Sequence, residues 1–368
     1  KGSISFSGAK DIRDSLLRLK VGSSLSIAEL LRVSALLRVA LRASDYGKRD
    51  HEPGEEDDAL DAMFRELAPV VSLAKEIDRC ILSEEEIADD ASNGLRSVRR
   101  AMKTAAEKIR TQLNSLVVNS RTYLQDGVIT MRNGRYCVPV KAEHKSNVPG
   151  MVHDQSSSGS TIFVEPLSVV KLNNELRELE IREQKEIEAV LAALSNQTCD
   201  HLDELTLDLE LIGELDFIFA KAALSRHYRG CEPRLNKDGI IRLKNARHPL
   251  LDPHRVVPIT LTLGENFDLL IVTGPNTGGK TVSLKTVGLL TLMGLAGLHV
   301  PAAEGTTLSV FNEVYADIGD EQSIEQNLST FSSHMTNTVK FLDKADKDSL
   351  VLFDELGAGT DPVEGAAL

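Results

Sequence analysis

One segment of the chain has the residue types and spacing of a phosphate-binding loop. Residues 274–281 fit the pattern G-x-x-x-x-G-K-T. Glycines let backbone N–H groups wrap around phosphates, and the N-terminus of a following helix faces their negative charge. Lys280 can reach the β- and γ-phosphates, and the Thr281 hydroxyl can ligate Mg²⁺. The pattern predicts that ATP with Mg²⁺ is bound by Gly274, Pro275, Asn276, Thr277, Gly278, Gly279, Lys280 and Thr281.

The sequence on both sides of this loop has the patterns of the elements that must position it. Residues 268–273, Asp-Leu-Leu-Ile-Val-Thr, have the composition of a buried strand. The segment after the loop repeats apolar residues at helical spacing, at Leu284, Val287, Leu292 and Leu295. The motif alone could match by accident in a long chain, but a strand before it and a helix after it are the context that supports it.

A second acidic site follows the loop at residues 350–355, Leu-Val-Leu-Phe-Asp-Glu. This pattern predicts a buried strand that ends in two carboxylates. Asp354 is expected in the Mg²⁺ shell, and Glu355 is expected to polarise the attacking water as general base. An acid directly after the metal-binding aspartate is characteristic of ATP-binding-cassette (ABC) ATPases.

Between these two sites lies the segment Asn327-Leu328-Ser329-Thr330-Phe331. Taken alone, Ser329 and Thr330 could be an ordinary helix cap. Their position between the loop and the acids favours a signature loop that contacts the nucleotide of a partner subunit.

Composition limits the classes that remain open. The chain has 368 residues, which predicts two or three domains, and its net charge of −13 leaves no strongly basic domain. Nucleic-acid binding would therefore depend on a local surface or on assembly. The four cysteines form no C-x-x-C pair, and no signal sequence is recognised, so we expect a cytoplasmic protein without a membrane span. The chain starts without Met and stops where a helix begins, which suggests a fragment.

Two long helical patterns flank a segment with different chemistry. Apolar residues recur every three or four positions from Leu95 to Leu116 and again from Leu172 to Leu194. Six basic residues and one acid lie between 95 and 110, whereas six glutamates and four basic residues lie between 171 and 188. We interpret the two as an outgoing and a returning arm, although they could be unrelated surface helices. The basic residues could simply pair with the glutamates.

Residues 122–165, between the arms, alternate as β-strands do. Strand patterns cover 128–131, 135–140 and 161–164, and an Asn-Gly turn at 133–134 separates the first two. The segment is nearly neutral, which gives it no long basic face. Phe163-Val164-Glu165 matches the Phe-x-Glu of mismatch-binding proteins, but we interpret it as a coincidence within an alternating strand.

These motifs resemble the MutS family. The resemblance rests on residues 273–281, 329–331 and 354–360, on Arg247-His248-Pro249 and on Glu214-Leu215-Asp216. Residues 152–159 and 317–326 are most similar to the second bacterial type of this family.

The resemblance implies a mixed fold in five parts. It implies an α-helical core or lever, a small β clamp inserted on a helical arm, and an α/β P-loop ATPase domain of ABC type that is incomplete. The expected divisions are 1–94 helical core or lever, 95–121 outgoing arm, 122–165 clamp, 166–231 returning arm and core, and 232–368 ATPase.

The resemblance also implies an ATPase that closes as a homodimer on nucleic acid. One subunit would supply residues 274–281, Asp354 and Glu355, and the other Ser329 and Thr330. The nucleic acid would be branched DNA, with suppression of recombination, or the rRNA of collided ribosomes that are sensed and split. The switch histidine, the last ATPase strands and a nuclease (endonuclease) domain would follow residue 368.

Two other interpretations remain open. A chromosome-maintenance ABC head would also join a nucleotide site to a coiled arm, but its phosphate loop stands near the N-terminus, and here the loop begins at Gly274. A non-hydrolysing helical scaffold would use the nucleotide only to set its conformation. Glu355 argues against the scaffold, because a pocket that only binds does not need a base.

Overall fold

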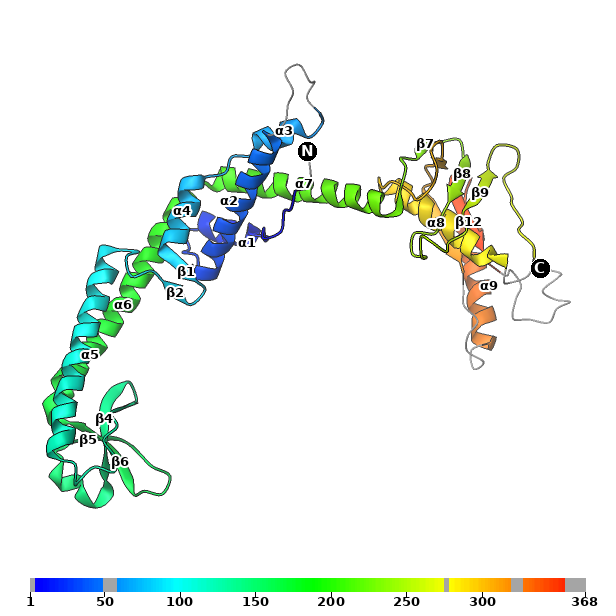
Figure 1. Cartoon of the computed structure of the whole chain (residues 1–368). Helices are drawn as coiled ribbons and strands as arrows, with labels where there is room; N and C mark the ends of the chain where they lie inside the picture. Colours follow the sequence, from blue (N-terminus) through cyan, green and yellow to red (C-terminus); the bar gives the residue numbers. More distant parts are fainter. Residues whose placement is uncertain (1–3, 49–57, 275–277, 319–326, 355–368) are drawn as a thin grey trace. The chain divides into compact units, whose positions relative to one another are not determined.

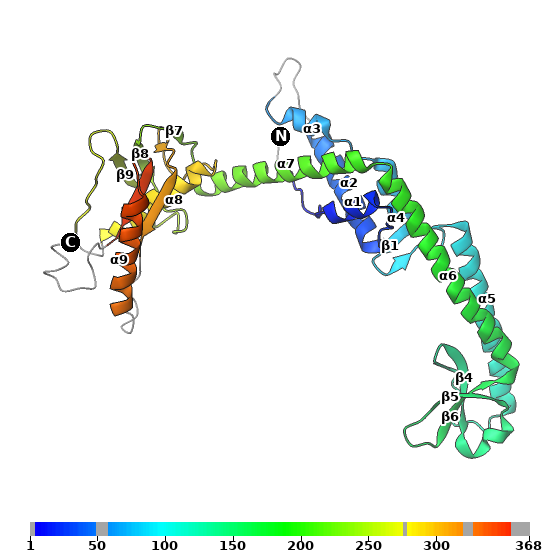
Figure 2. The same cartoon turned by 180° about the vertical axis from the view of Figure 1, so that it is seen from behind.

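The computed structural model describes residues 4–48, 58–274, 278–318 and 327–354, except for the side chains of residues 327–334. The chain divides into two compact units, Lys1–Asp216 and Phe217–Leu368, and each is described by itself. Both units combine helices with small sheets (Figures 1 and 2). The mixed helix-and-sheet class predicted from the sequence is therefore confirmed, whereas the five-part division stays a prediction.

The first unit begins with a helical core. Its elements are α1 (Arg13–Lys20), α2 (Ile27–Gly47), α3 (Asp61–Glu66), α4 (Val71–Cys80), β1 (Ile81–Ser83) and β2 (Glu86–Ile87). Helix α2 begins with a capping box, in which Ser26 and Glu29 each accept a hydrogen bond from the other's backbone N–H. Its Leu30, Val33 and Leu37 are buried, and α2 packs against α4. The buried positions follow helical spacing, so this core is built from one face of each helix.

Helices α5 (Asn93–Asn119) and α6 (Leu167–Cys199) form the arm (Figure 1). They pack along each other and run in opposite directions. Arg99, near the start of α5, pairs with Glu183 at the middle of α6, whereas Leu113 near the end of α5 shares a core with Val169 at the start of α6. The predicted pair of outgoing and returning helices is confirmed, and the alternative of two unrelated surface helices is wrong.

The segment between the arm helices is an antiparallel sheet, which we call the clamp. Its strands are β3 (Thr130–Arg132), β4 (Arg135–Lys141), β5 (Gly150–Gln155) and β6 (Thr161–Pro166), in the order β3-β4-β6-β5. Asn133 and Gly134 have φ of 50° and 73°, as a tight two-residue hairpin requires. Val138 of β4 faces Val164 of β6, and both are buried in the core shared with the arm.

Helix α7 (Leu202–Tyr228) carries an aspartate that is buried in the first unit. Asp208 Oδ1 accepts a hydrogen bond of 2.8 Å from the Ala68 N–H. Its Oδ2 has no hydrogen-bond partner among the described residues. Burial raises the pKa of Asp208 to about 6, and the charge of Glu204 adds to this effect while the Ala68 hydrogen bond opposes it.

This buried carboxyl predicts a pH dependence of stability. Because the folded state holds the proton more tightly than the unfolded chain, stability should fall as pH rises from about 4 to about 6. Asp208→Asn keeps an acceptor for Ala68 and cannot ionise, so it should unfold at higher urea concentration than wild type at pH 7. The gain should be about 3 kcal/mol at most, and it should vanish below pH 4. Equal urea midpoints at pH 7 would contradict the burial argument.

In its described residues, the second unit contains two small sheets and two helices besides the end of α7. Its elements are β7 (Arg234–Asn236), β8 (Ile241–Ala246), β9 (Ile259–Leu263), α8 (Lys280–Leu295), β10 (Thr307–Ser309), β11 (Glu313–Asp317), α9 (Asn327–Lys344) and β12 (Ser349–Phe353). One sheet has the order β7-β10-β8-β9, and the other is the parallel pair β11-β12. Among the described helices, none combines the length and apolar character that crossing a membrane requires.

The strand predicted at residues 268–273 is wrong in this structure. The segment has no strand geometry, and Leu269 and Ile271 are 75% and 73% exposed instead of buried. A strand needs a neighbour to pair its N–H and C=O groups, and no described strand pairs with this segment. Apolar composition alone does not supply that neighbour.

Candidate nucleotide-binding site

The described part of the phosphate-binding loop has the backbone shape that its glycines allow. Gly274 and Gly279 have φ of 142° and 77°, where a residue with a side chain would be strained. A Cβ at Gly274, Gly278 or Gly279 would meet no atom of the described residues within 4 Å, so the space beside them is open. A ligand can therefore approach this backbone closely.

Helix α8 begins directly after Gly279, as the motif predicts. Lys280 is its first residue, and Lys280 Nζ donates a hydrogen bond to the Gly274 carbonyl, so the lysine spans the loop. The first turn of α8 is closed at Ser283, whose N–H and hydroxyl both donate to the Gly279 carbonyl at 2.9 Å. The first N–H groups of α8 and the Lys280 ammonium give this end of the helix a positive potential that suits phosphate.

A close contact joins α8 to the strand that carries the acidic site. Val287 and Leu290 of α8 share one core with Leu350 and Leu352 of β12. A Cβ at Gly288 would lie 2.6 Å from Leu352 Cδ1, so a larger residue at this position would require the Leu352 side chain to shift. Of the predicted apolar positions on α8, Val287 is buried, whereas Leu292 is 51% exposed.

The acidic site lies at the end of the parallel pair β11-β12. The Asp354 N–H donates to the Asp317 carbonyl at 3.0 Å, which extends the pairing by one residue beyond β12. Asp317 ends β11, is buried, and accepts a hydrogen bond of 3.2 Å from the Asn337 side chain of α9. In the sequence, Asp317 appears only within the segment 317–326 that resembles the MutS family, and no role at this site was predicted for it. The strand-like alternation of residues 313–317 was the signal that could have predicted a strand beside 349–353.

Helix α9 is anchored on these two strands by aromatic rings. The Phe341 ring lies 5.0 Å from the Tyr315 ring of β11 and 5.8 Å from the Phe353 ring of β12. Ser329 and Thr330 are the third and fourth residues of α9, so both are placed in a helix that packs beside the acidic site. Their side chains lie outside the description.

Other predicted site residues lie outside the described part of the chain. These are Pro275, Asn276, Thr277 and the expected general base Glu355. The structure therefore describes Gly274, Gly278, Gly279, Lys280, Thr281 and Asp354 from the predicted set. It places Lys280 and Thr281 on α8 and Asp354 at the end of β12, two elements that share one core.

His248, from the Arg247-His248-Pro249 motif, adds to the electrostatics of α8. Burial lowers the pKa of His248, and the positive charge of Lys285 on α8 lowers it further. The neighbouring Arg247 N–H donates to the Pro301 carbonyl at 2.8 Å, which holds the motif against the segment after α8. This imidazole is therefore neutral near pH 7 and adds no charge beside the phosphate-binding helix.

The end of α7 is tied to the segment that follows α8. Tyr228 Oη donates to the His299 carbonyl at 2.7 Å, and Ser225 Oγ lies 2.9 Å from His299 Nδ1. Cys231 and Val300 exchange two backbone hydrogen bonds, each of 2.9 Å. Two hydrogen bonds from the last turn of α7 and two from Cys231 just after it thus join this part of the chain to the segment that leaves α8.

The clamp sheet shows why the Phe163-Val164-Glu165 match is a coincidence. Glu165 is fully buried and accepts hydrogen bonds from Arg135 at 2.8 Å, His153 at 2.6 Å and Asn173 at 2.8 Å. Phe163 is covered by the Arg132 guanidinium, 4.2 Å from its ring centroid. Both side chains already contact other residues of the protein, so neither is available to contact a nucleic-acid base.

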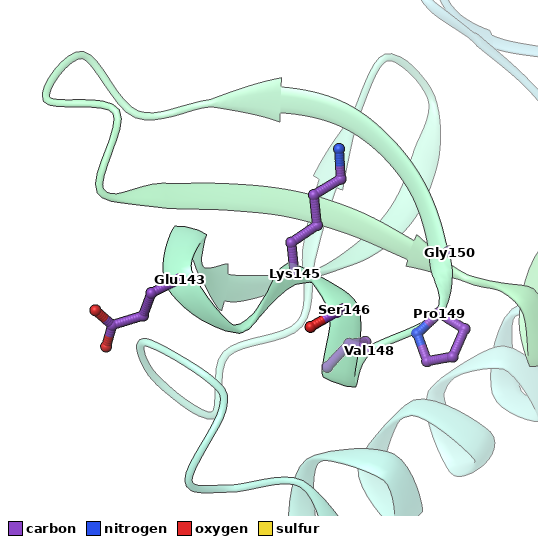
Figure 3. Close-up of a pocket in the computed structure, with 6 residues that line it drawn as sticks. All are labelled: Glu143, Lys145, Ser146, Val148, Pro149 and Gly150. Atoms are coloured by element: carbon purple, nitrogen blue, oxygen red, sulfur yellow. The ribbon is translucent and has the colours of Figure 1, made fainter.

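A shallow hollow lies on the clamp beside the short helix η1 (Ala142–Asn147) (Figure 3). Lys145, Val148 and Gly150 are among the residues that line it. Figure 3 shows the Lys145 side chain extending across the strands, whereas the Glu143 side chain extends away from them. The hollow holds one cation and one acid on opposite sides, which is no cluster of convergent groups for a small ligand.

The pairing expected between the arm cations and the glutamates of α6 is limited to one residue. Arg99 contacts Glu183 at 2.7 Å and also pairs with Asp89 of the preceding loop. Among the described residues, the other five cations between 95 and 110 form no ion pair with α6. The interpretation that these residues serve mainly to pair the two helices is therefore wrong.

Comparison with known proteins assigns the family. The family model described as MutS domain V matches residues 270–368. Over 374 residues the chain is 58% identical to a protein named Endonuclease MutS2 from Lachnoclostridium phytofermentans, covering 100% of the chain and 47% of that protein. Proteins of the same name from Lachnospira eligens and Agathobacter rectalis are each 59% identical, covering 100% and 99% of the chain and 46% of each relative.

The chain spans about half the length of these curated relatives. The match with them nevertheless extends through the helical core, the arm, the clamp and the second unit. The chain therefore belongs to the MutS family and, within it, to the MutS2 type.

Proposed function

We propose that the chain is an ATP-binding and ATP-hydrolysing MutS-type clamp that closes as a dimer on nucleic acid. The observation that carries this proposal is the open space beside Gly274, Gly278 and Gly279, followed by a helix whose first residue is Lys280. The remaining steps rest on the acidic site and on the resemblance.

The described residues fit Mg²⁺ and a triphosphate. Thr281 and Asp354 offer hydroxyl and carboxylate oxygens, which are the ligands that Mg²⁺ prefers. When bound, the metal would neutralise charge on the phosphates. Lys280 and the N–H groups of α8 would orient the phosphate chain, and Glu355 would accept a proton from the attacking water.

Dimer closure is proposed because a phosphate-binding loop covers only one side of a triphosphate. Ser329 and Thr330, at the N-terminal turn of α9, would contact the γ-phosphate bound to the partner subunit. ATP would then favour the closed dimer, because it binds that state more tightly than the open one. A shift from 1:99 to 99:1 needs about 10⁴-fold tighter binding to the closed state.

The bound polymer is proposed to be nucleic acid, with branched DNA or ribosomal RNA as the two candidates. The arm and clamp form an elongated helical pair with a sheet between its helices, which suits contact with a large assembly. In this proposal the chain would take part in suppressing recombination or in splitting collided ribosomes. A relative's name, Endonuclease MutS2, describes a protein about twice as long, and we assign no nuclease role to any residue of this chain.

Glu355→Gln tests hydrolysis against the alternative of a non-hydrolysing scaffold. The amide cannot accept the proton of water, so the variant should bind ATP with wild-type affinity and retain it. Light scattering should show a dimer with ATP, and radiolabelled ATP should stay intact for many times the wild-type turnover time. If wild type and variant retain ATP equally, the pocket only binds, and the scaffold interpretation replaces the enzyme.

A further inference from the structure

The outer face of α5 carries a row of exposed cations, Arg96, Arg100, Lys103 and Arg110, which we call the α5 row. At about 100° per residue, all four lie within roughly 80° of one another around the helix, opposite the buried seam. They extend over about 21 Å at a rise of 1.5 Å per residue. Glu107 is the one acid on this face between residues 96 and 110.

The α5 row is little used within the protein. Among the described residues, Arg100 and Lys103 have no ion-pair partner, and Arg96 lies 3.7 Å from the exposed Asp90. Arg110 lies 6.0 Å from the ring centroid of Tyr136 on β4, which leaves its charge at the clamp end of the row. Arg99 lies on the side of α5 that faces α6, and its ion pair with Glu183 joins the two helices.

The row also works against helix stability. Arg96 and Arg100 are one helical turn apart, as are Arg100 and Lys103, and each like-charge pair costs a few tenths of a kcal/mol. The row starts within the first turns of α5, where the helix dipole favours acids over cations. Neither arrangement helps folding, so the stability of α5 does not explain the row.

We propose that the α5 row binds the phosphate backbone of duplex DNA. A small anion would satisfy one or two cations, whereas a duplex has a phosphate for about every 1.7 Å of its axis and can match a row of 21 Å. The aromatic side chain beside the row, Tyr136, is partly buried against the core of the arm and not free for a base to stack on, which favours a duplex over single strands.

The charge on the other arm helix limits where the duplex can lie. Glu175, Glu178 and Glu188 are exposed on α6, interspersed with cations such as Arg182 and Lys185. This mixed surface attracts phosphate far less than the α5 row does. In a chain with a net charge of −13, a local row of this kind is the way to contact a polyanion. The proposal rests on the proposed nucleic-acid function and names the surface and the polymer.

The test compares two double variants of the 368-residue chain. Arg100→Gln with Lys103→Gln removes two charges from the row, and Arg182→Gln with Lys185→Gln removes two exposed charges from α6. Binding to a 30-base-pair DNA duplex is measured by fluorescence anisotropy from 50 to 300 mM salt. Thermal melting and ATP binding are measured for both variants and should equal those of wild type.

The row variant should weaken DNA binding at least tenfold near 100 mM salt. Its plot of log K against log salt should be shallower than that of wild type by about 1.8, since each lost phosphate contact removes about 0.9. The α6 variant should keep the wild-type slope. Equal losses in both variants, or an unchanged slope in the row variant, would overturn the proposal. The proposal would also be overturned if the row variant lost affinity for single-stranded RNA but kept the wild-type affinity for duplex DNA.

The same experiment separates this proposal from the broader function. If wild type binds no duplex at any salt concentration while ATP binding is intact, both the α5 row and a DNA-binding clamp are rejected. If wild type binds the duplex and the row variant binds it as wild type does, the clamp function stands and only the α5 row is rejected.

Discussion

Lys280→Ala is expected to abolish ATP binding. The lysine opens α8 and spans the loop to the Gly274 carbonyl, so its ammonium stands where the phosphates would lie. A charge-assisted hydrogen bond to a phosphate in a partly enclosed site is about twice as strong as a neutral one, and the alanine variant loses its charge as well. Isothermal titration with ATP should give no measurable heat at concentrations that saturate the wild type.

The matched control for this variant is Lys347→Ala, which removes an exposed lysine of the same unit in the turn before β12. It should bind ATP as wild type does. Circular dichroism and thermal melting should show that both variants keep the helical content of wild type. An alanine variant at 280 that binds ATP with unchanged affinity would refute the phosphate-loop assignment.

Glu165→Ala is expected to destabilise the clamp by about 3–5 kcal/mol, the usual cost of leaving buried charges unpaired. Burial raises the pKa of Glu165, but hydrogen bonds from Asn173, Arg135 and His153 outweigh it, so the carboxylate is ionised well below neutral pH. Without it, the Arg135 guanidinium faces the sheet with no acceptor of opposite charge. Hydrogen exchange in β4 and β6 should become faster by two orders of magnitude or more.

Asp154→Asn serves as the control, because Asp154 pairs with Arg132 at 3.1 Å on the same sheet but both side chains are well exposed. Exposed pairs contribute about 0–1 kcal/mol. Exchange in β4 and β6 should therefore remain within about fivefold of wild type. If both variants accelerate exchange equally, the buried network does not hold the clamp together.

The helical arm could be predicted from the sequence because its signal is long. The spacing from Leu95 to Leu116 repeats over several turns, and its partner helix shows the same spacing, so local pattern and tertiary packing agree. The hairpin at Asn133-Gly134 could be predicted for a similar reason, since few residues tolerate the left-handed backbone that the turn requires.

Other features of the structure depend on tertiary contacts that no local sequence pattern predicts. Strand β5 was not expected, because its register shifts between Val152 and Asp154 and the bulge breaks the alternation. Residues 268–273 are apolar enough for a strand, but strand formation depends on a neighbour and not on composition. The buried role of Glu165 depends on Asn173 and Arg135, which only the folded sheet brings to it.

The candidate nucleotide-binding site also contains some residues that a local pattern predicts and others that it does not. The motif alone located Lys280 and the start of α8, because glycines and a helix start have fixed local geometry. It did not reveal Gly288, whose hydrogen lets α8 approach Leu352, nor Asp317 beside Asp354. These residues act through packing between elements that lie far apart in the sequence.

The hydrogen bonds between the end of α7 and the segment after α8 offer a reference for distance measurements. Cys231 and Val300 cannot slide past each other without breaking both of their backbone bonds, and Tyr228 and Ser225 hold His299 beside them. Fluorophores attached at the exposed residues Ala223 and Ala296 would thus report a constant separation through the proposed cycle of ATP binding, hydrolysis and release. That pair provides an internal ruler against which changes elsewhere in the chain can be calibrated.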